Sequence, residues 1–399
     1  MMLAAIAVSV SHLVQSTRAG ADYGLSLVPL IALIVVLKYP AFRFAVDYSS
    51  ATGRSLVTAY ANLGRLALTW LAVAFFIDMF IATAAVALVT AGLVISVFSL
   101  PFSGPQVAIA LTVASALLLL NGTYAKTERL VKYLVYLFSF LSLAAMVLAL
   151  PRLGNEGRHL FAELTPGRSL AVFAIAVAGW MPMPMTGSIF HSIWVCEKRQ
   201  GDGARFGHRQ ALVDLRVGYS LTLILAISFV VLGTAVLFET DRAMPTTTGA
   251  FANELLMVFT TIIGNRSYPV IAVAAAAVMW STLLTLLDAL PRVTDRLFGI
   301  MTARPAGAPQ RYRAFLLLQV GGVSLLLLFL LRGFTTYIDF ATGAGFLAAP
   351  ALAYYNYRAV TSPDVGGEFR PSPRLVLWNT ISIVILALCA AAFFALRMV

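Results

Sequence analysis

The sequence predicts an all-α polytopic membrane protein with about eleven transmembrane helices. Of its 399 residues, 60% are hydrophobic and only 11% are charged, whereas soluble globular chains carry about 25% charged residues. The hydrophobic residues fall into runs of the length that crosses a bilayer, which is about 20 residues for a helix. Lys and Arg gather in alternate connections between these runs, as they do in membrane proteins of fixed orientation.

The apolar runs give the order of the predicted spans. They lie at 2–20, 24–46, 66–99, 105–121, 130–150, 169–194, 212–238, 268–290, 314–332, 336–357 and 374–397. The first run begins without a basic n-region or a small-residue cleavage site, so we interpret it as a span and not as a removed signal peptide. The shorter stretch 251–263 predicts a helix at the membrane interface before the eighth span.

Basic residues predict the orientation. They follow the second, fourth, sixth, eighth and tenth spans, at Arg43, Arg54, Arg65, Lys126, Arg129, Lys132, Lys198, Arg199, Arg205, Arg209, Arg292, Arg296, Arg304, Arg311, Arg313, Arg358, Arg370 and Arg374. Because Lys and Arg favour the cytoplasmic side, we predict a bacterial-type inner (plasma) membrane protein with a cytoplasmic N-terminus and an outside C-terminus. These loops also explain the net charge of +11, so we expect the lipid bilayer and no nucleic acid as a partner.

Motifs of enzymes are absent from the sequence. It contains no phosphate-binding loop, nucleophile elbow, metalloprotease pair or dinucleotide fingerprint. Its two cysteines, Cys196 and Cys389, show no metal or redox spacing. We therefore predict that the chain is not an enzyme, needs no cofactor, and moves a small solute across its membrane.

An odd number of spans is what an inverted repeat of five plus five helices and one added helix would give. The repeats would be 1–150 and 169–357, with 374–397 as the added helix. In such transporters the first helix of each repeat is broken, and the substrate binds at the breaks. The stretch 179–187 contains Pro182 and Pro184 and ends at Gly187, which predicts a break in the sixth span. A proline kink in a packed helix is the alternative.

Several segments carry a resemblance to a known family. They are 19–21 (Ala-Gly-Ala), 38–44 (Lys-Tyr-Pro-Ala-Phe-Arg-Phe), 51–53 (Ala-Thr-Gly), 128–130 (Glu-Arg-Leu) and 190–192 (Phe-His-Ser). At these residues the chain resembles the Nramp family of proton-coupled divalent-metal transporters. The resemblance covers nearly the whole chain and implies a LeuT-type fold with broken helices 1 and 6.

The resemblance also implies changes at the metal site. Counting back from Ala19-Gly20, the family's Asp-Pro-Gly-Asn motif falls on 9–12, where Ser9 and His12 stand in place of both metal-binding side chains. The family's Met-Pro-His motif falls on 184–186, or with a one-residue gap its Met-Pro falls on 183–184. On the proton route, Asp78 matches an acidic position and His191 matches the second histidine of the sixth span, whereas Ile81 replaces the next acidic residue.

The two predicted breaks offer a donor set without a carboxylate. The candidate substrate-binding residues are Ser9, Ser11, His12, Met183, Met185, Thr186 and Gly187. Magnesium and calcium require oxygen ligands that carry charge, so they fit this set poorly. Binding of a soft transition ion by His12 and Met183 remains an alternative. The alternative for the methionines is that they only line an apolar wall.

An anion fits the same donors better. Half-helix N-termini carry about half a positive charge each, and Ser9 does not offset it as the family's carboxylate does. His12 adds an imidazole, and Arg18 adds a charge near the site, although an interfacial arginine is the alternative for Arg18. We therefore expect a secondary transporter of a small inorganic anion such as bicarbonate, with protons as a candidate coupling ion. The alternatives are proton-coupled manganese or iron transport and, third, a non-transporting membrane sensor.

Overall fold

The computed structural model describes residues 10–121, 124–154, 159–202, 206–240, 244–304, 307–329 and 333–398, with side chains left undescribed at 124–132, 202 and 397–398. These ranges form helices and their connections. The helices are η1 (Ser11–Ser16), α2 (Thr17–Tyr23), α3 (Val28–Thr52), α4 (Leu56–Leu63), α5 (Arg65–Ile77), η2 (Asp78–Ala82), α6 (Thr83–Phe98), α7 (Gly104–Leu120), α8 (Tyr124–Leu153), α9 (Arg168–Gly179), α10 (Gly187–Asp202), α11 (His208–Val236), α12 (Thr248–Ile263), η4 (Asn265–Ser267), α13 (Tyr268–Met301), α14 (Pro309–Phe329), α15 (Phe334–Val360), η5 (Gly367–Phe369) and α16 (Pro373–Met398).

These helices match the predicted spans in order. In the described part of the chain, seven helical stretches are long and apolar enough to cross a membrane. The third predicted span is α5 and α6 joined through η2, and the predicted interfacial helix is α12. The first span is described from Val10 and is helical to Tyr23. At 1.5 Å per residue, this stretch is about 20 Å long, which is shorter than the roughly 30 Å of a bilayer core.

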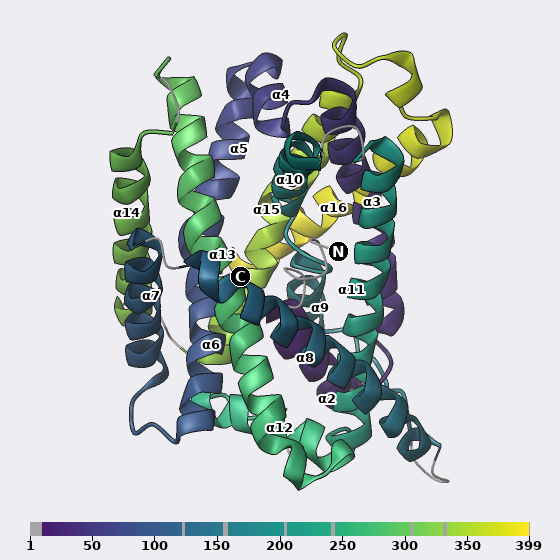
Figure 1. Cartoon of the computed structure of the whole chain (residues 1–399). Helices are drawn as coiled ribbons and strands as arrows, with labels where there is room; N and C mark the ends of the chain where they lie inside the picture. Colours follow the sequence, from purple (N-terminus) through teal and green to yellow (C-terminus); the bar gives the residue numbers. More distant parts are fainter. Residues whose placement is uncertain are drawn as a thin grey trace.

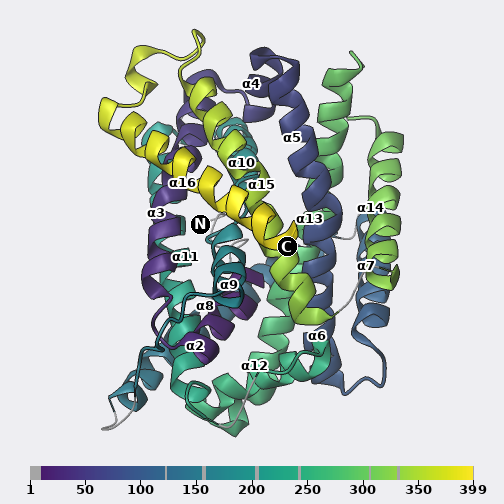
Figure 2. The same cartoon turned by 180° about the vertical axis from the view of Figure 1, so that it is seen from behind.

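The broken sixth span lies in the middle of the bundle. In Figures 1 and 2, α9 and α10 are central, with α7 and α14 at one edge and α3 and α11 at the other. Figure 2 also shows α16 crossing the bundle obliquely. Two cores meet here, because the buried Met181, Met183 and Met185 pack with side chains of α3 and α15, whereas Trp180 packs with those of α6 and α13.

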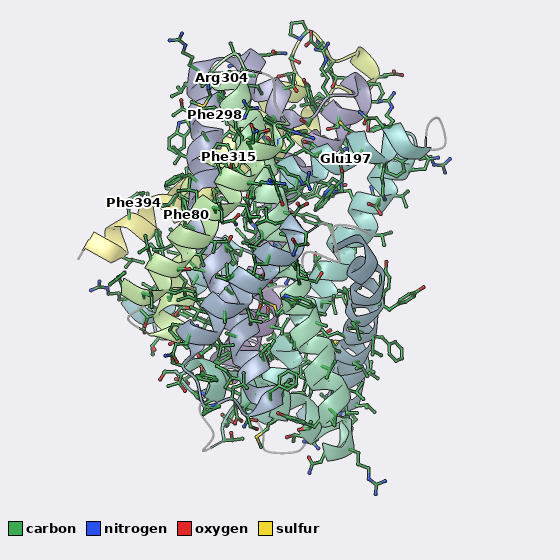
Figure 3. All side chains as sticks on the ribbon, turned by 60° about the vertical axis from the view of Figure 1, so that its left-hand side comes forward. Phe80, Glu197, Phe298, Arg304, Phe315 and Phe394 are labelled. Atoms are coloured by element: carbon green, nitrogen blue, oxygen red, sulfur yellow. The ribbon has the colours of Figure 1, made fainter. Side chains whose placement is uncertain are left out.

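The outer surface of the bundle is apolar at mid-height. Large side chains such as Phe76, Phe329 and Leu388 are exposed by 61%, 77% and 65%, as expected of a surface that meets lipid tails. Figure 3 shows the labelled Phe80 and Phe394 on this part of the surface, whereas Arg304 lies near one end. This distribution agrees with the membrane-spanning arrangement that the sequence predicts.

Four of the basic connections lie at one end of the molecule. The connections that follow α3, α10, α13 and α15 lie at the upper end in Figures 1 and 2, and α12 lies at the opposite end with the connection between α6 and α7. These four connections follow the second, sixth, eighth and tenth predicted spans. Their common side is the arrangement that alternate basic loops require.

Candidate functional site

The sixth span is broken by a non-helical segment at 180–186. The first half-helix, α9, ends at Gly179, and the second, α10, begins at Gly187. Pro182 follows a cis peptide bond, and Pro182 and Pro184 both lack the N–H that a helix would use. The prolines therefore produce the break predicted in 179–187, and Gly187 is already helical.

Two glycines allow this segment to pack closely. A Cβ on Gly179 would lie 1.9 Å from the backbone oxygen of Thr342 in α15, and a Cβ on Gly187 would lie 2.7 Å from the sulfur of Met183. Both separations are far below van der Waals contact. The end of α9 is therefore held against the backbone of α15, and Met183 folds over the start of α10.

The first N–H groups of α10 are already bonded in this conformation. The N–H groups of Gly187 and Ser188 donate to the carbonyl oxygens of Pro184 and Met185, at 2.9 and 3.0 Å, and that of Ile189 donates to Thr186. The expected free donors at this half-helix are thus occupied. A solute that binds them must first displace the carbonyls of the break.

Asp78 and Thr186 meet at the break. The Thr186 hydroxyl donates to Oδ2 of Asp78 at 2.5 Å. Asp78 opens the π-helical turn η2 inside the third span, and such turns occur often at functional sites. Beside this pair, Ala344 and Gly345 of α15 help to line a cavity of about 10 Å³, which is room for a single water molecule. The candidate proton residue and a candidate substrate residue thus form one buried site.

The candidate residues of the first span lie beside α9. Ser9 is outside the described residues, and Ser11 and His12 lie in the π-helical turn η1, which packs against α9 and α11. The His12 ring is fully buried, with Nε2 3.0 Å from the carbonyl oxygen of Thr222 in α11 and Nδ1 3.2 Å from the Ser11 hydroxyl. Because a carbonyl only accepts, Nε2 carries the proton. No hydrogen bond joins His12 to the segment 180–186 among the described residues.

Arg18 is part of a polar network between the first and tenth spans. Its guanidinium donates to both carboxylate oxygens of Asp339 in α15, at 2.6 and 3.3 Å, and to Gln15 at 3.1 Å. Gln15 donates in turn to Asp339 and to Thr342. Arg18 also lies 4.8 Å from the ring centre of Phe173 in α9. Arg18, Phe173 and Asp339 line part of a surface cavity of about 610 Å³. Arg18 therefore links three elements and is more than an isolated interfacial arginine.

His191 is buried in α10 and has no hydrogen-bond partner on either ring nitrogen in the described part of the chain. Its ring packs edge-on against Trp194, with centroids 6.4 Å apart. The contact between Asp78 and Thr186 thus does not extend through a hydrogen bond to His191. A role for His191 in proton movement stays a prediction.

Lys38 of α3 also reaches the break, and the sequence did not predict this contact. It is fully buried in α3, and its ammonium donates to the carbonyl oxygens of Ala178 and Gly179 at 3.0 and 2.7 Å, with Met183 at 3.5 Å. A lysine in the middle of an apolar span is costly and is by default a functional candidate. A lysine within an apolar span could have been noticed in the sequence. In the stretch 38–44, however, Lys38 was used only as support for the family resemblance.

Comparison with known families identifies the chain. The model of the family described as natural resistance-associated macrophage protein-like, or Nramp, matches residues 1–396. The chain belongs to the Nramp family. As an Nramp protein it is a membrane transporter and not an enzyme. A relative, the uncharacterized protein PM0681 of Pasteurella multocida, is 28% identical over 99% of this chain and 90% of its own length.

Solved structures share the fold of this Nramp protein. A mutant of the manganese transporter of Eremococcus coleocola matches with a TM-score of 0.70 at 14% identity, covering 98% of this chain and 84% of that one. Mhp1, a nucleobase-cation-symport-1 transporter in a closed conformation, matches with a TM-score of 0.56 at 14% identity, covering 100% and 88%. The predicted LeuT-type, all-α fold is thereby confirmed.

Proposed function

We propose that this Nramp protein is a secondary transporter of a small inorganic anion, such as bicarbonate, which binds at the break of the sixth span. The observation that carries the proposal is the donor set of the break. The segment 180–186 has no carboxylate, and the described residues contain no group of three or more His, Cys, Asp or Glu side chains that is placed to hold a metal ion. The ammonium of Lys38 lies at the same break.

Alternating access fits the occluded geometry. The cavity beside Asp78 and Thr186 holds about one water molecule, so a solute enters only after helices move apart. We propose that 1–150 and 169–357 are inverted repeats that move against each other, with 374–397 as an added helix. The proposed orientation has the N-terminus inside and the C-terminus outside the inner membrane, and protons are the proposed coupling ion.

A second candidate function is proton-coupled transport of manganese or iron. The observation that favours it is the carboxylate of Asp78, which accepts the Thr186 hydrogen bond at the break where Met185 also lines the cavity. A carboxylate with a nearby thioether could ligate a transition ion once the site opens. We place this second because a single carboxylate is a weak ligand set, and because the motif positions 9–12 lack the acidic residue that the family resemblance implies.

Ser9→Asp and Met183→Ala distinguish the candidates by opposite signs. An aspartate at position 9 adds the negative charge that a cation needs and an anion avoids. For an anion, Ser9→Asp and His12→Ala should abolish bicarbonate flux into proteoliposomes, and Met183→Ala should leave most of it. For a metal, Ser9→Asp should preserve or improve manganese flux and Met183→Ala should destroy it. The second pattern would overturn the proposal.

A further inference from the structure

The amino group of Lys38 reaches the end of the first half-helix of the broken span. Lys38 lies within the 25-residue helix α3 and is not exposed at all. Two of its acceptors, the carbonyl oxygens of Ala178 and Gly179, belong to the last turn of α9, and the third, that of Met183, lies within the break. Carbonyl oxygens at a helix C-terminus carry partial negative charge, and the Ala178 oxygen also accepts the N–H of Met181 at 3.4 Å. They form a cage of the kind that binds a cation.

The partners of this ammonium are all neutral. Besides the three carbonyl oxygens, it lies 5.5 Å from the ring centre of Phe346, which is itself buried. Within the described ranges, none of its contacts is a carboxylate, and the carboxyl of Asp78 is bonded to Thr186. A buried charge without a counter-charge is costly. An anion that enters the break lowers this cost, whereas a cation raises it.

The indole of Trp180 points to the same ligand chemistry. Trp180 follows Gly179 directly and is 3% exposed, and its N–H has no acceptor within the described residues. Indole N–H and ammonium groups only donate hydrogen bonds. The start of the break therefore has positive charge and an unused donor, which match an oxyanion and oppose a metal ion.

We propose that Lys38 is the resident cation of the break. Its ammonium occupies the cage of Ala178, Gly179 and Met183 carbonyls where a free cation would otherwise bind, and its charge selects an anion as substrate. This inference rests on the proposed anion transport and names the residue that sets the charge preference.

Chemical rescue tests the cage without any transport assay. Lys38→Ala removes the ammonium and frees the carbonyls. At constant ionic strength, the thermal unfolding midpoint of Lys38→Ala should therefore be several degrees higher in methylammonium or sodium than in N-methylglucamine. The wild type and Lys38→Met, whose side chain fills the space, should show no such shift. Lys198→Met is the matched control, since Lys198 is partly exposed and pairs with Asp214. A Lys38→Ala protein that ignores these cations would overturn the cage.

Flux measurements test the charge. Lys38→Met keeps the length of the side chain but loses its charge, so its bicarbonate flux into proteoliposomes should be at least tenfold below that of the wild type. Lys38→Arg should retain more bicarbonate flux than Lys38→Met. The control Lys198→Met should have the flux of the wild type. Wild-type rates in Lys38→Met would overturn the inference and leave anion transport standing. Wild-type manganese flux without bicarbonate flux would overturn the proposed function, and the rescue experiment would then still decide whether Lys38 replaces a bound cation.

Discussion

At the scale of single residues, Asp78 is the acidic group that touches the break. Its hydrogen bond from Thr186 joins the third span to the sixth across 108 positions of sequence. The carboxyl can gain or lose a proton, whereas an asparagine accepts the same hydrogen bond and cannot ionise. We expect Asp78→Asn to fold normally, to bind substrate nearly as well, and to lose the pH dependence of its flux. Asp288→Asn, in an ion pair with Arg292, is the control, and an unchanged pH profile in Asp78→Asn would make Asp78 a structural partner only.

The Arg18–Asp339 pair is the second test at this scale. Both side chains are mostly buried, at 12% and 16% exposure, so removing one leaves the other charge without its partner. Arg18→Gln and Asp339→Asn should each lower stability by about 2 kcal/mol. The double variant should lose less than the sum, by roughly 1 kcal/mol. Thermal unfolding in detergent of the wild type, the two single variants and the double variant measures this coupling. Additive losses of stability would show that the pair is not coupled.

Residue-level contacts were the least predictable part of the site. From the sequence, Asp78 was singled out by its match to the family's proton route, Thr186 by its place in the predicted break, and His12 as an ionisable group in a span. The backbone partners of the buried side chains were not predicted. His12 bonds the carbonyl of Thr222, and Lys38 bonds the carbonyls of Ala178 and Gly179. Main-chain atoms are the same at every position, so the sequence does not indicate which carbonyl a side chain will bond. Only the folded arrangement brings such partners together.

At the scale of elements, the break depends on the close approach of α9 to α15. The Cβ of an alanine at position 179 would meet the Thr342 backbone oxygen at 1.9 Å, and backbone atoms cannot move aside cheaply. We expect Gly179→Ala to cost about 3 kcal/mol or more and to lower the yield of folded protein. Gly321→Ala is the control, because nothing lies within 4 Å of its Cβ, and it should stay within about 1 kcal/mol of the wild type. Equal thermal midpoints of the two variants would contradict this packing.

Elements were predicted better than contacts. The proline pair in 179–187 marked the broken span correctly, since the loss of two N–H groups is a local effect. The π-helical turns at Ser11–Ser16 and Asp78–Ala82 were not predicted, because they arise where tertiary packing inserts an extra residue per turn. The contact of Trp180 with Gly345 of α15 was not predicted for a similar reason, because the two residues are distant in sequence.

At the scale of the whole molecule, the common end of the described basic connections supports one orientation in the membrane. A tag inserted in the connection at 198–209 should therefore be cytoplasmic, and a reporter after the last residue should be periplasmic. Paired alkaline phosphatase and fluorescent protein fusions measure both positions. A cytoplasmic reporter at the C-terminus would contradict the odd number of spans.

The central claim is that an Nramp fold with an ammonium at its break carries an anion. The most direct test is the flux of the wild-type protein, reconstituted into one batch of liposomes and measured for bicarbonate and for manganese in parallel. We predict saturable bicarbonate flux, sensed as a change of internal pH, and no manganese flux above that of empty liposomes. Saturable manganese flux that iron inhibits and bicarbonate leaves unchanged would contradict the claim and establish a metal transporter with unusual ligands.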